Sequence, residues 1–167
     1  MDIVVYGTAY TPDYDADAPR TNVFKHADMT PELAAKTVGL PVFIEHDDAY
    51  PIGTVAHAEI DARRFMRVAL HVRGNPIAAE LLPGALSVDP DTGKRFFTGL
   101  SMGTDVTLDL RSRAFTTVAA VRPTEISIVR RPDRPMADIT DYDLVPHSTT
   151  RKELFATIRK KFESAVK

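Results

Sequence analysis

The feature that most constrains the fold is a regular alternation of apolar and polar residues across residues 96–110. In an extended chain, Leu100 and Met102 fall on one face, while Ser101 and Gly103 fall on the other. A period of two residues is typical of a β-strand that packs one face against a core. The segment therefore predicts a long strand in a sheet whose two faces differ in polarity.

Shorter segments rich in β-branched and aromatic residues, bounded by turn residues, predict further strands. We expect these strands at residues 3–8, 40–46, 52–60, 65–72, 116–122 and 125–129. Three helices are expected at residues 30–38, 77–82 and 150–166. A Thr-Pro-Glu cap opens the first, Pro83-Gly84 stops the second, and a Thr-x-x-Glu capping box opens the third. Residues 133–147 are expected to form a loop.

The order of these elements favours one fold class. Many short strands with few helices, and no regular alternation of strands and helices, predict a mainly β fold of the α+β type. We expect a small closed or partly closed β-barrel flanked by about three helices. The length of 167 residues predicts a single domain over residues 1–167, with its last helix at about 150–166.

Composition narrows the chemistry that the chain can perform. The formal net charge is −2, so no general electrostatic attraction favours nucleic acid or membrane surfaces, and neither partner is expected. The absence of cysteine excludes a thiol nucleophile, disulfide bonds and cysteine-based zinc sites. We see no signal-peptide pattern and no apolar run of membrane-spanning length, so secretion is not expected.

A histidine and a serine stand where a hydroxyl-based catalytic site needs them. The alternation of residues 40–46 places His46 at the end of an apolar strand face, where an oriented imidazole can act as a base. Ser101 lies between Gly99 and Gly103, whose missing side chains would let a substrate backbone approach the hydroxyl. Each residue also has an ordinary explanation, namely a turn histidine bonded to a neighbouring Asp and a strand serine beside glycines that permit close packing.

An acidic residue and two arginines complete the set of candidates. Glu125 opens an otherwise apolar strand, and its carboxylate could orient an imidazole and stabilise the imidazolium. Arg130 and Arg131 follow that strand, and their N–H groups could stabilise an oxyanion. Exposed charges at the ends of a strand are the ordinary alternative for all three residues.

Three short motifs occur in one order along the chain: Leu40-Pro-Val-Phe-Ile-Glu-His46-Asp-Asp, Gly99-Leu-Ser101-Met-Gly103 and Thr124-Glu125-Ile-Ser-Ile-Val-Arg130-Arg131-Pro132. Together they resemble the histidine, serine and third boxes of the capsid-maturation serine proteases of herpesviruses and of the prohead proteases of tailed phages. The herpesvirus enzymes have a second histidine where this chain has Glu125. The phage enzymes more often carry an acidic residue there, so the third motif is similar to the phage pattern.

The resemblance implies a fold, an activity and partners. It implies a β-barrel core flanked by helices, and a serine endopeptidase with His46, Ser101 and Glu125 as its catalytic residues and no cofactor. The implied substrates are the scaffolding protein and the scaffold-like extension of the major capsid protein inside the immature capsid, with possible self-cleavage. It also implies a homodimer, for which the C-terminal amphipathic helix could supply an interface.

Two alternatives remain open from the residues alone. A small β-barrel could serve as a non-catalytic capsid or scaffold interaction module that keeps the fold without the chemistry. A metal-dependent hydrolase centred on His46 and Asp48, with Asp47 and His57 as further ligands, is also conceivable, although the spacing of these residues matches no strong metal-binding pattern.

Overall fold

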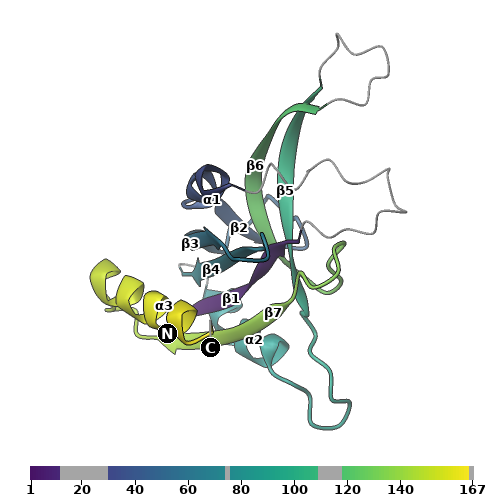
Figure 1. Cartoon of the computed structure of the whole chain (residues 1–167). Coiled ribbons are helices and arrows are strands. Elements are labelled where there is room, and N and C mark those ends of the chain that lie inside the picture. Colours follow the sequence, from purple (N-terminus) through teal and green to yellow (C-terminus); the bar gives the residue numbers. More distant parts are fainter. Residues whose placement is uncertain (12–29, 74–75, 109–117, 166–167) are drawn as a thin grey trace.

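The computed structural model describes residues 1–11, 30–73, 76–108 and 118–165. In this part of the chain, seven strands and three helices form the architecture shown in Figure 1. The strands are β1 (Asp2–Tyr10), β2 (Pro41–Ile44), β3 (Gly53–Ile60), β4 (Met66–Val72), β5 (Gly99–Leu108), β6 (Val118–Val129) and β7 (Ile139–Val145). The helices are α1 (Pro31–Thr37), α2 (Pro76–Leu86) and α3 (Arg151–Ser164). None of the described helices is long and apolar enough to cross a lipid bilayer.

The seven strands form one curled sheet in the order β5-β6-β2-β3-β4-β1-β7. Neighbouring strands are antiparallel except for β2 and β6, which run parallel. The sheet curls into a half-barrel, and β5 and β6 form a long ribbon that extends beyond the other strands (Figure 1). The prediction of an α+β fold with a partly closed barrel and three helices is therefore confirmed.

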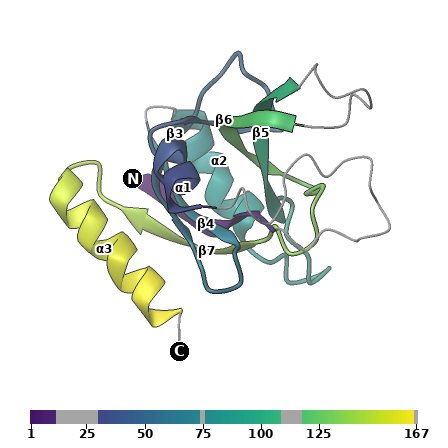
Figure 2. The ribbon, with the colours of Figure 1, turned by 45° about the horizontal axis from the view of Figure 1, so that its top comes forward.

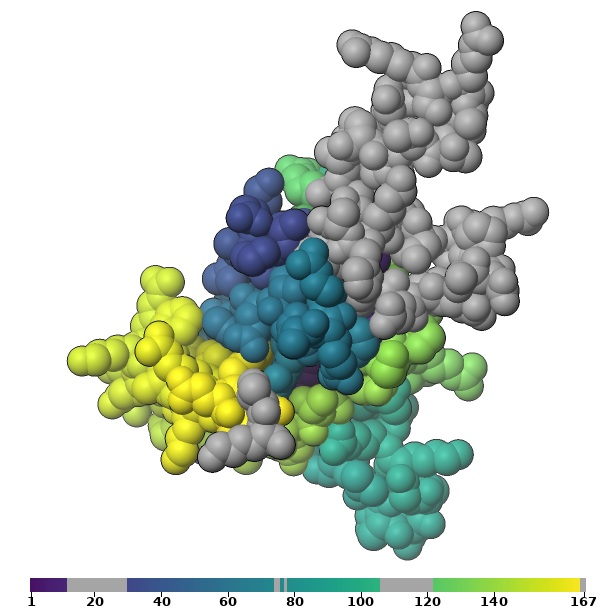
Figure 3. Space-filling model, in the orientation of Figure 1, coloured from purple at the N-terminus to yellow at the C-terminus, as the bar shows by residue number. Residues whose placement is uncertain are grey.

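The main core lies inside the curl of the sheet, and a smaller one lies outside it. Along β1, Ile3 and Val5 belong to the inner core, while Val4 and Tyr6 belong to the outer one. The outer core exists because α3 covers this side of the sheet with three buried apolar residues, Leu154, Ile158 and Phe162. Figures 2 and 3 show α3 lying along the outside of the sheet, where its buried residues pack against side chains of β1, β4 and β7. Every residue of β1 is buried because both faces of this strand are covered.

The expected helix starts are confirmed in detail. The Thr30 hydroxyl accepts a hydrogen bond from the backbone N–H of Leu33, and Pro31 occupies the first helical position. Thr150 and Glu153 form a complete capping box at the start of α3. These contacts span three residues or fewer, so the local sequence is sufficient to specify them.

Three expectations about element boundaries were wrong. The second helix continues through Pro83-Gly84 to Leu86, because buried Leu82 and Leu86 anchor both sides of the proline in the core. The strands expected at 116–122 and 125–129 form one strand, β6, over the described residues 118–129, whereas 116 and 117 lie outside the described residues; a shift in its pairing with β5 accommodates Pro123. The expected loop at 133–147 contains β7, which pairs with β1 at the sheet edge and whose apolar residues do not alternate regularly with its polar ones.

Candidate functional site

His46 and Glu125 lie in direct contact although they are 79 residues apart in the chain. The His46 Nδ1 atom is 2.5 Å from the Glu125 Oε1 atom. The Glu125 side chain is 12% exposed, whereas the His46 side chain is 45% exposed. A sheltered carboxylate that accepts the Nδ1 proton leaves the Nε2 atom of the imidazole able to accept a proton from another group.

The chain reaches this geometry through an unusual turn at the end of β2. The strand ends at Ile44, and the next two residues have positive φ angles, 50° at Glu45 and 62° at His46. These left-handed conformations break the alternation of the strand and bring the imidazole to Glu125. The expectation that His46 continues the apolar face of residues 40–44 was therefore wrong.

Glu45 holds this turn against the end of β6. Its backbone N–H donates to the Ile128 carbonyl at 3.0 Å, and its Oε1 atom accepts hydrogen bonds from the backbone N–H and the Nε–H of Arg130, at 2.8 Å and 3.0 Å. Partial burial raises the pKa of Glu45, but the hydrogen bonds from Arg130 outweigh it and hold this pKa below its usual value. Left-handed backbone costs about 1–2 kcal/mol per residue, and these contacts offset part of that cost.

The two arginines thus lie in different settings. Arg130 donates both its backbone N–H and its Nε–H to Glu45, so an oxyanion contact from its N–H would require that bond to open. Arg131 is exposed, and no ion pair of its side chain occurs in the described parts of the chain. An oxyanion role for either arginine stays a prediction.

Ser101 lies on the same face of the sheet as Glu125. The β5–β6 register pairs Ser101 with Ser127 and Gly103 with Glu125, so these four residues share one face. The opposite face belongs to the inner core, where Leu100 and Ile128 are buried. Ser101 itself is half-buried, and within the described residues its hydroxyl makes no hydrogen bond to His46 or Glu125. Hydrogen bonds of this kind are often long before substrate binds.

Ser127 is a member of this cluster that sequence reasoning missed. It is 0% exposed, and its hydroxyl donates to the Glu125 Oε2 atom at 2.6 Å. Directly opposed residues in an antiparallel pair have Cβ atoms about 4.5–5.5 Å apart, so Ser127 is also an immediate neighbour of Ser101. The sequence contained a signal for Ser127, because a residue two positions after Glu125 in a strand must lie on the same face as Glu125.

The packing of the fold explains why residues 99 and 103 beside Ser101 are glycines. A Cβ atom at Gly103 would overlap the carboxylate of Glu125. A Cβ atom at Gly99 would overlap Pro132 and the carbonyl oxygen of Ala137. The protein's own atoms therefore fill the space that was expected to admit a substrate backbone, and Gly103 makes room for the carboxylate that contacts His46.

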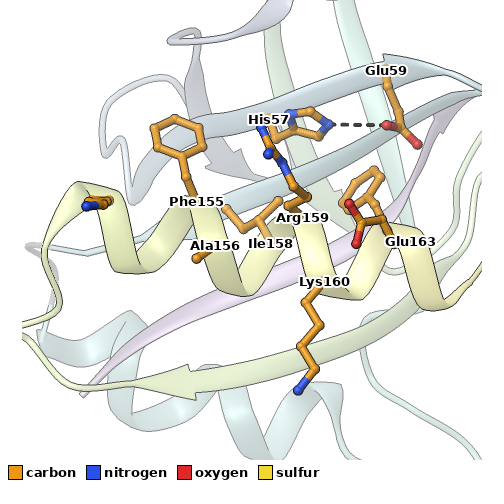
Figure 4. Close-up of a pocket in the computed structure, with 10 residues that line it drawn as sticks. His57, Glu59, Phe155, Ala156, Ile158, Arg159, Lys160 and Glu163 are labelled. Atoms are coloured by element: carbon orange, nitrogen blue, oxygen red, sulfur yellow. Dashed lines mark hydrogen bonds and ion pairs between the residues drawn. The ribbon is translucent and has the colours of Figure 1, made fainter.

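His57 does not join His46. In the antiparallel β2–β3 ladder Pro41 pairs with Thr54, so His57 lies beyond the start of β2, whereas His46 follows its end. His57 instead lies in a hollow of about 770 Å³ between β3 and α3, where its ring contacts Phe162 and its Nε2 atom is 3.4 Å from Glu59 (Figure 4). Among the residues that the structure describes, no group of three or more His, Asp or Glu side chains is arranged to hold a metal ion.

Comparison with solved structures defines the class of fold. The chain has the fold of the herpesvirus proteases. It aligns with the protease of Kaposi's sarcoma-associated herpesvirus in complex with a hexapeptide phosphonate inhibitor, with a TM-score of 0.61 and 14% identity over 98% of this chain and 77% of that chain. A structure of the same viral protease with a dimer disruptor aligns with a TM-score of 0.51 and 13% identity, over 95% and 88% of the two chains.

Comparison of the sequence alone finds no relative of this chain. No protein-family model matches the chain, and no curated protein sequence matches it. At such low identity the structural likeness establishes the fold, and the chemistry has to be argued from the residues of this chain.

Proposed function

We propose that this protein is a serine endopeptidase in which Ser101 is the nucleophile, His46 the general base and Glu125 the residue that orients His46. The observation that carries the proposal is the His46–Glu125 hydrogen bond on the sheet face that also bears Ser101. A carboxylate, an imidazole and a hydroxyl are the three groups that hydroxyl-based acyl transfer requires. The herpesvirus protease fold supports the same reading.

The roles follow from the chemistry of each group. His46 Nε2 takes the proton of the Ser101 hydroxyl as its oxygen attacks the carbonyl carbon of a peptide bond. Glu125 stabilises the imidazolium that forms, and the imidazolium then gives the proton to the leaving amine. Water, deprotonated by the same imidazole, hydrolyses the acyl-enzyme and regenerates Ser101.

The proposed substrates are the scaffolding protein and the scaffold-like extension of the major capsid protein, cleaved inside the immature capsid of a virus. The order of the three sequence motifs supports this assignment, together with the fold. We also propose that the protein acts as a homodimer and cleaves its own chain. One structural neighbour is a herpesvirus protease in complex with a dimer disruptor, and this supports the dimer proposal.

The test is labelling with a fluorophosphonate, which reacts covalently with activated serine hydroxyls, at high protein concentration. Intact mass and peptide mapping should give one adduct on Ser101, and none in the Ser101→Ala or His46→Ala variants. Ser148→Ala, which removes an exposed serine before α3, is the matched control and should label like the wild type. A folded dimer that takes up no probe would overturn the proposal.

A second candidate is a non-catalytic capsid or scaffold interaction module with the same fold. The absence of a hydrogen bond between Ser101 and His46 within the described residues favours it. This candidate predicts binding to scaffolding protein without labelling of Ser101, so the same experiment separates the two functions.

A further inference from the structure

Glu45 and Arg130 join the end of β2 to the end of β6 by hydrogen bonds that meet at one oxygen atom. The Glu45 Oε1 atom accepts from the backbone N–H of Arg130 at 2.8 Å and from its Nε–H at 3.0 Å. The backbone N–H of Glu45 adds a bond to the carbonyl oxygen of Ile128 at 3.0 Å. This pair of residues, the Glu45–Arg130 clasp, therefore fixes both the backbone and the side chain of Glu45.

Arg130 is itself held from the other side. Its carbonyl oxygen accepts a hydrogen bond from the Thr98 hydroxyl at 2.7 Å, and its guanidinium lies 5.7 Å from the centre of the Phe96 ring. The Phe96 ring packs edge-on against Phe97, with centroids 4.9 Å apart, and Phe97 belongs to the inner core. Arg130 is thus a well-supported anchor for the carboxylate of Glu45.

A contribution to folding stability does not explain the clasp. The side chains of Glu45 and Arg130 are 39% and 60% exposed, and exposed ion pairs contribute little to stability. The clasp nevertheless holds two consecutive left-handed residues, Glu45 and His46. Strained backbone of this kind persists only where surrounding contacts impose it, and it is concentrated at functional sites. The clasp therefore has to be explained by what the strained turn carries.

The strained turn carries the imidazole of His46. This residue follows Glu45 directly, and its Nδ1 atom is 2.5 Å from the Glu125 Oε1 atom. If the turn relaxed to extended backbone, the side chain of His46 would return to the alternating faces of the strand, and its Nδ1 atom would leave Glu125. The clasp therefore determines whether the imidazole and the carboxylate meet.

The position of the clasp in the sheet also bears on the role of Arg130. Strand β6 lies between β5 and β2. The backbone N–H of Arg130 is directed to the β2 side, where it binds Glu45, whereas Ser101 lies on β5 at the other side of β6. A donor that stabilises an oxyanion has to lie about 2.7–3.1 Å from that oxygen atom. The N–H of Arg130 is thus occupied, and it points away from the strand that carries the candidate nucleophile.

We propose that the Glu45–Arg130 clasp is a positioning device, which holds His46 against Glu125 with the proton on its Nδ1 atom, and that Arg130 acts on the site through Glu45 rather than by touching the oxyanion. Both residues are positioning residues, because neither contacts the reacting atoms. The effect on rate rests on the proposed endopeptidase function. The effect on the imidazole can be measured without catalysis.

The first measurement is the tautomer of His46 in two amide variants. Glu45→Gln keeps the length of the side chain and an acceptor oxygen, whereas Glu45→Asn is one methylene shorter and tolerates left-handed backbone well. Long-range ¹H–¹⁵N spectra of the imidazole are recorded at about pH 9, above the range in which histidine ordinarily changes charge, and the signals are assigned by their loss in His46→Ala. Wild type and Glu45→Gln should carry the proton on Nδ1, and Glu45→Asn should show a mixture of tautomers. A Glu45→Asn spectrum like that of the wild type, in a protein shown to be folded by urea unfolding, would overturn the proposal.

The second measurement is a double-mutant cycle on the rate of fluorophosphonate labelling. Glu45→Asn should slow labelling by about 10- to 100-fold, because a displaced base is a poor base. Arg130→Ala leaves the backbone N–H that binds Glu45, so its loss should be smaller, about 3- to 10-fold. In the Glu45→Asn background, Arg130→Ala should change the rate by less than about twofold, because the residue through which it acts is gone. An equal loss in both backgrounds would show that Arg130 acts directly on the reaction and would overturn its assignment to the clasp.

A control and the combined outcomes separate the clasp from the endopeptidase. Asp105→Ala removes the 62% exposed carboxylate of another cross-strand ion pair with an arginine, Arg122, and should label like the wild type. A tautomer that changes in Glu45→Asn, in a protein that is never labelled, would refute the endopeptidase and leave the clasp in place. Labelling of Ser101 that proceeds equally in wild type and Glu45→Asn would refute the clasp and leave the endopeptidase in place.

Discussion

The carboxylate of Glu125 occupies the space that Gly103 leaves by having no side chain. The two residues face each other across the β5–β6 ladder, and the same carboxylate contacts His46. Gly103 therefore influences the candidate site through the position of Glu125, and any side chain at this point must displace the carboxylate.

Gly103→Ala is expected to impair the site more than the fold. Overpacking of this kind costs about 1–3 kcal/mol of stability, whereas a displacement of about 1 Å in a catalytic group can cost 100-fold in rate. We expect the rate of fluorophosphonate labelling to fall by about 10- to 100-fold, measured beside chemical denaturation. Gly84→Ala is the control, because a Cβ atom there meets no neighbour, and in the α2 helix it should stabilise by about 0.5–1 kcal/mol. Equal labelling by Gly103→Ala and wild type would contradict this account.

Ser127→Ala removes the donor to the second oxygen of Glu125. A hydrogen bond to a charged group contributes about 1.5–3 kcal/mol, and Ser127 is fully buried, so a loss of this size is expected in urea unfolding. The labelling rate of Ser101 should fall as well, because the carboxylate gains freedom to leave His46. Ser127→Cys retains the size and a weaker donor and should be intermediate. Wild-type stability in Ser127→Ala would show that this hydrogen bond contributes nothing.

Glu45→Gln should change how stability depends on pH. The pKa of Glu45 is held below its usual value, so the carboxylate stabilises the folded state above the unfolded pKa of about 4.3, and this contribution is lost as the pH falls through the lower folded pKa. The side chain is 39% exposed, so solvent screening limits the effect to below about 1 kcal/mol. Urea unfolding should show wild type above the variant by a constant margin from about pH 5.5 to 7, with the margin shrinking below about pH 4.5. A stability difference between wild type and variant that grows as the pH falls would contradict the predicted direction of the effect.

Phe162→Ala should detach α3 from the sheet. Phe162 is 5% exposed, and its ring contacts those of Tyr6 and His57 with centroid distances of 6.2 Å and 4.8 Å. Removal of a buried Phe costs about 3–5 kcal/mol. Hydrogen exchange should increase over α3 and β7 before it increases over β5 and β6. Phe155→Ala, at a half-buried position of the same helix, is the control and should cost less.

Local patterns were sufficient for much of the fold. Period-two alternation located β5, and the capping residues Thr30 and Thr150 located two helix starts, because each signal acts within a few residues. The same local rules failed for β7, because its apolar residues, Ile139, Tyr142, Leu144 and Val145, do not alternate regularly with its polar ones and so do not separate an edge strand from a loop.

The candidate site was predictable in its residue types and less so in its contacts. His46, Ser101 and Glu125 were chosen from their positions on strands, and the structure brings the first and last of these into contact. The roles of all three residues in catalysis stay predictions until labelling is measured. The partnership of Glu45 with Arg130 was not foreseen, because it links the ends of two strands that are distant in sequence.

The amino-acid sequence by itself determined most of the strands and helices, although not β7, and it determined that a side-chain nucleophile here is not a thiol. These properties follow from backbone periodicity and side-chain chemistry, which act locally. Only the tertiary structure decided that His46 leaves the apolar face of β2, that Ser127 binds Glu125, and that Gly103 makes room for the carboxylate. These relationships depend on the parallel β2–β6 pairing and on the β5–β6 register, and pairing of distant strands is set by the packing of the whole sheet.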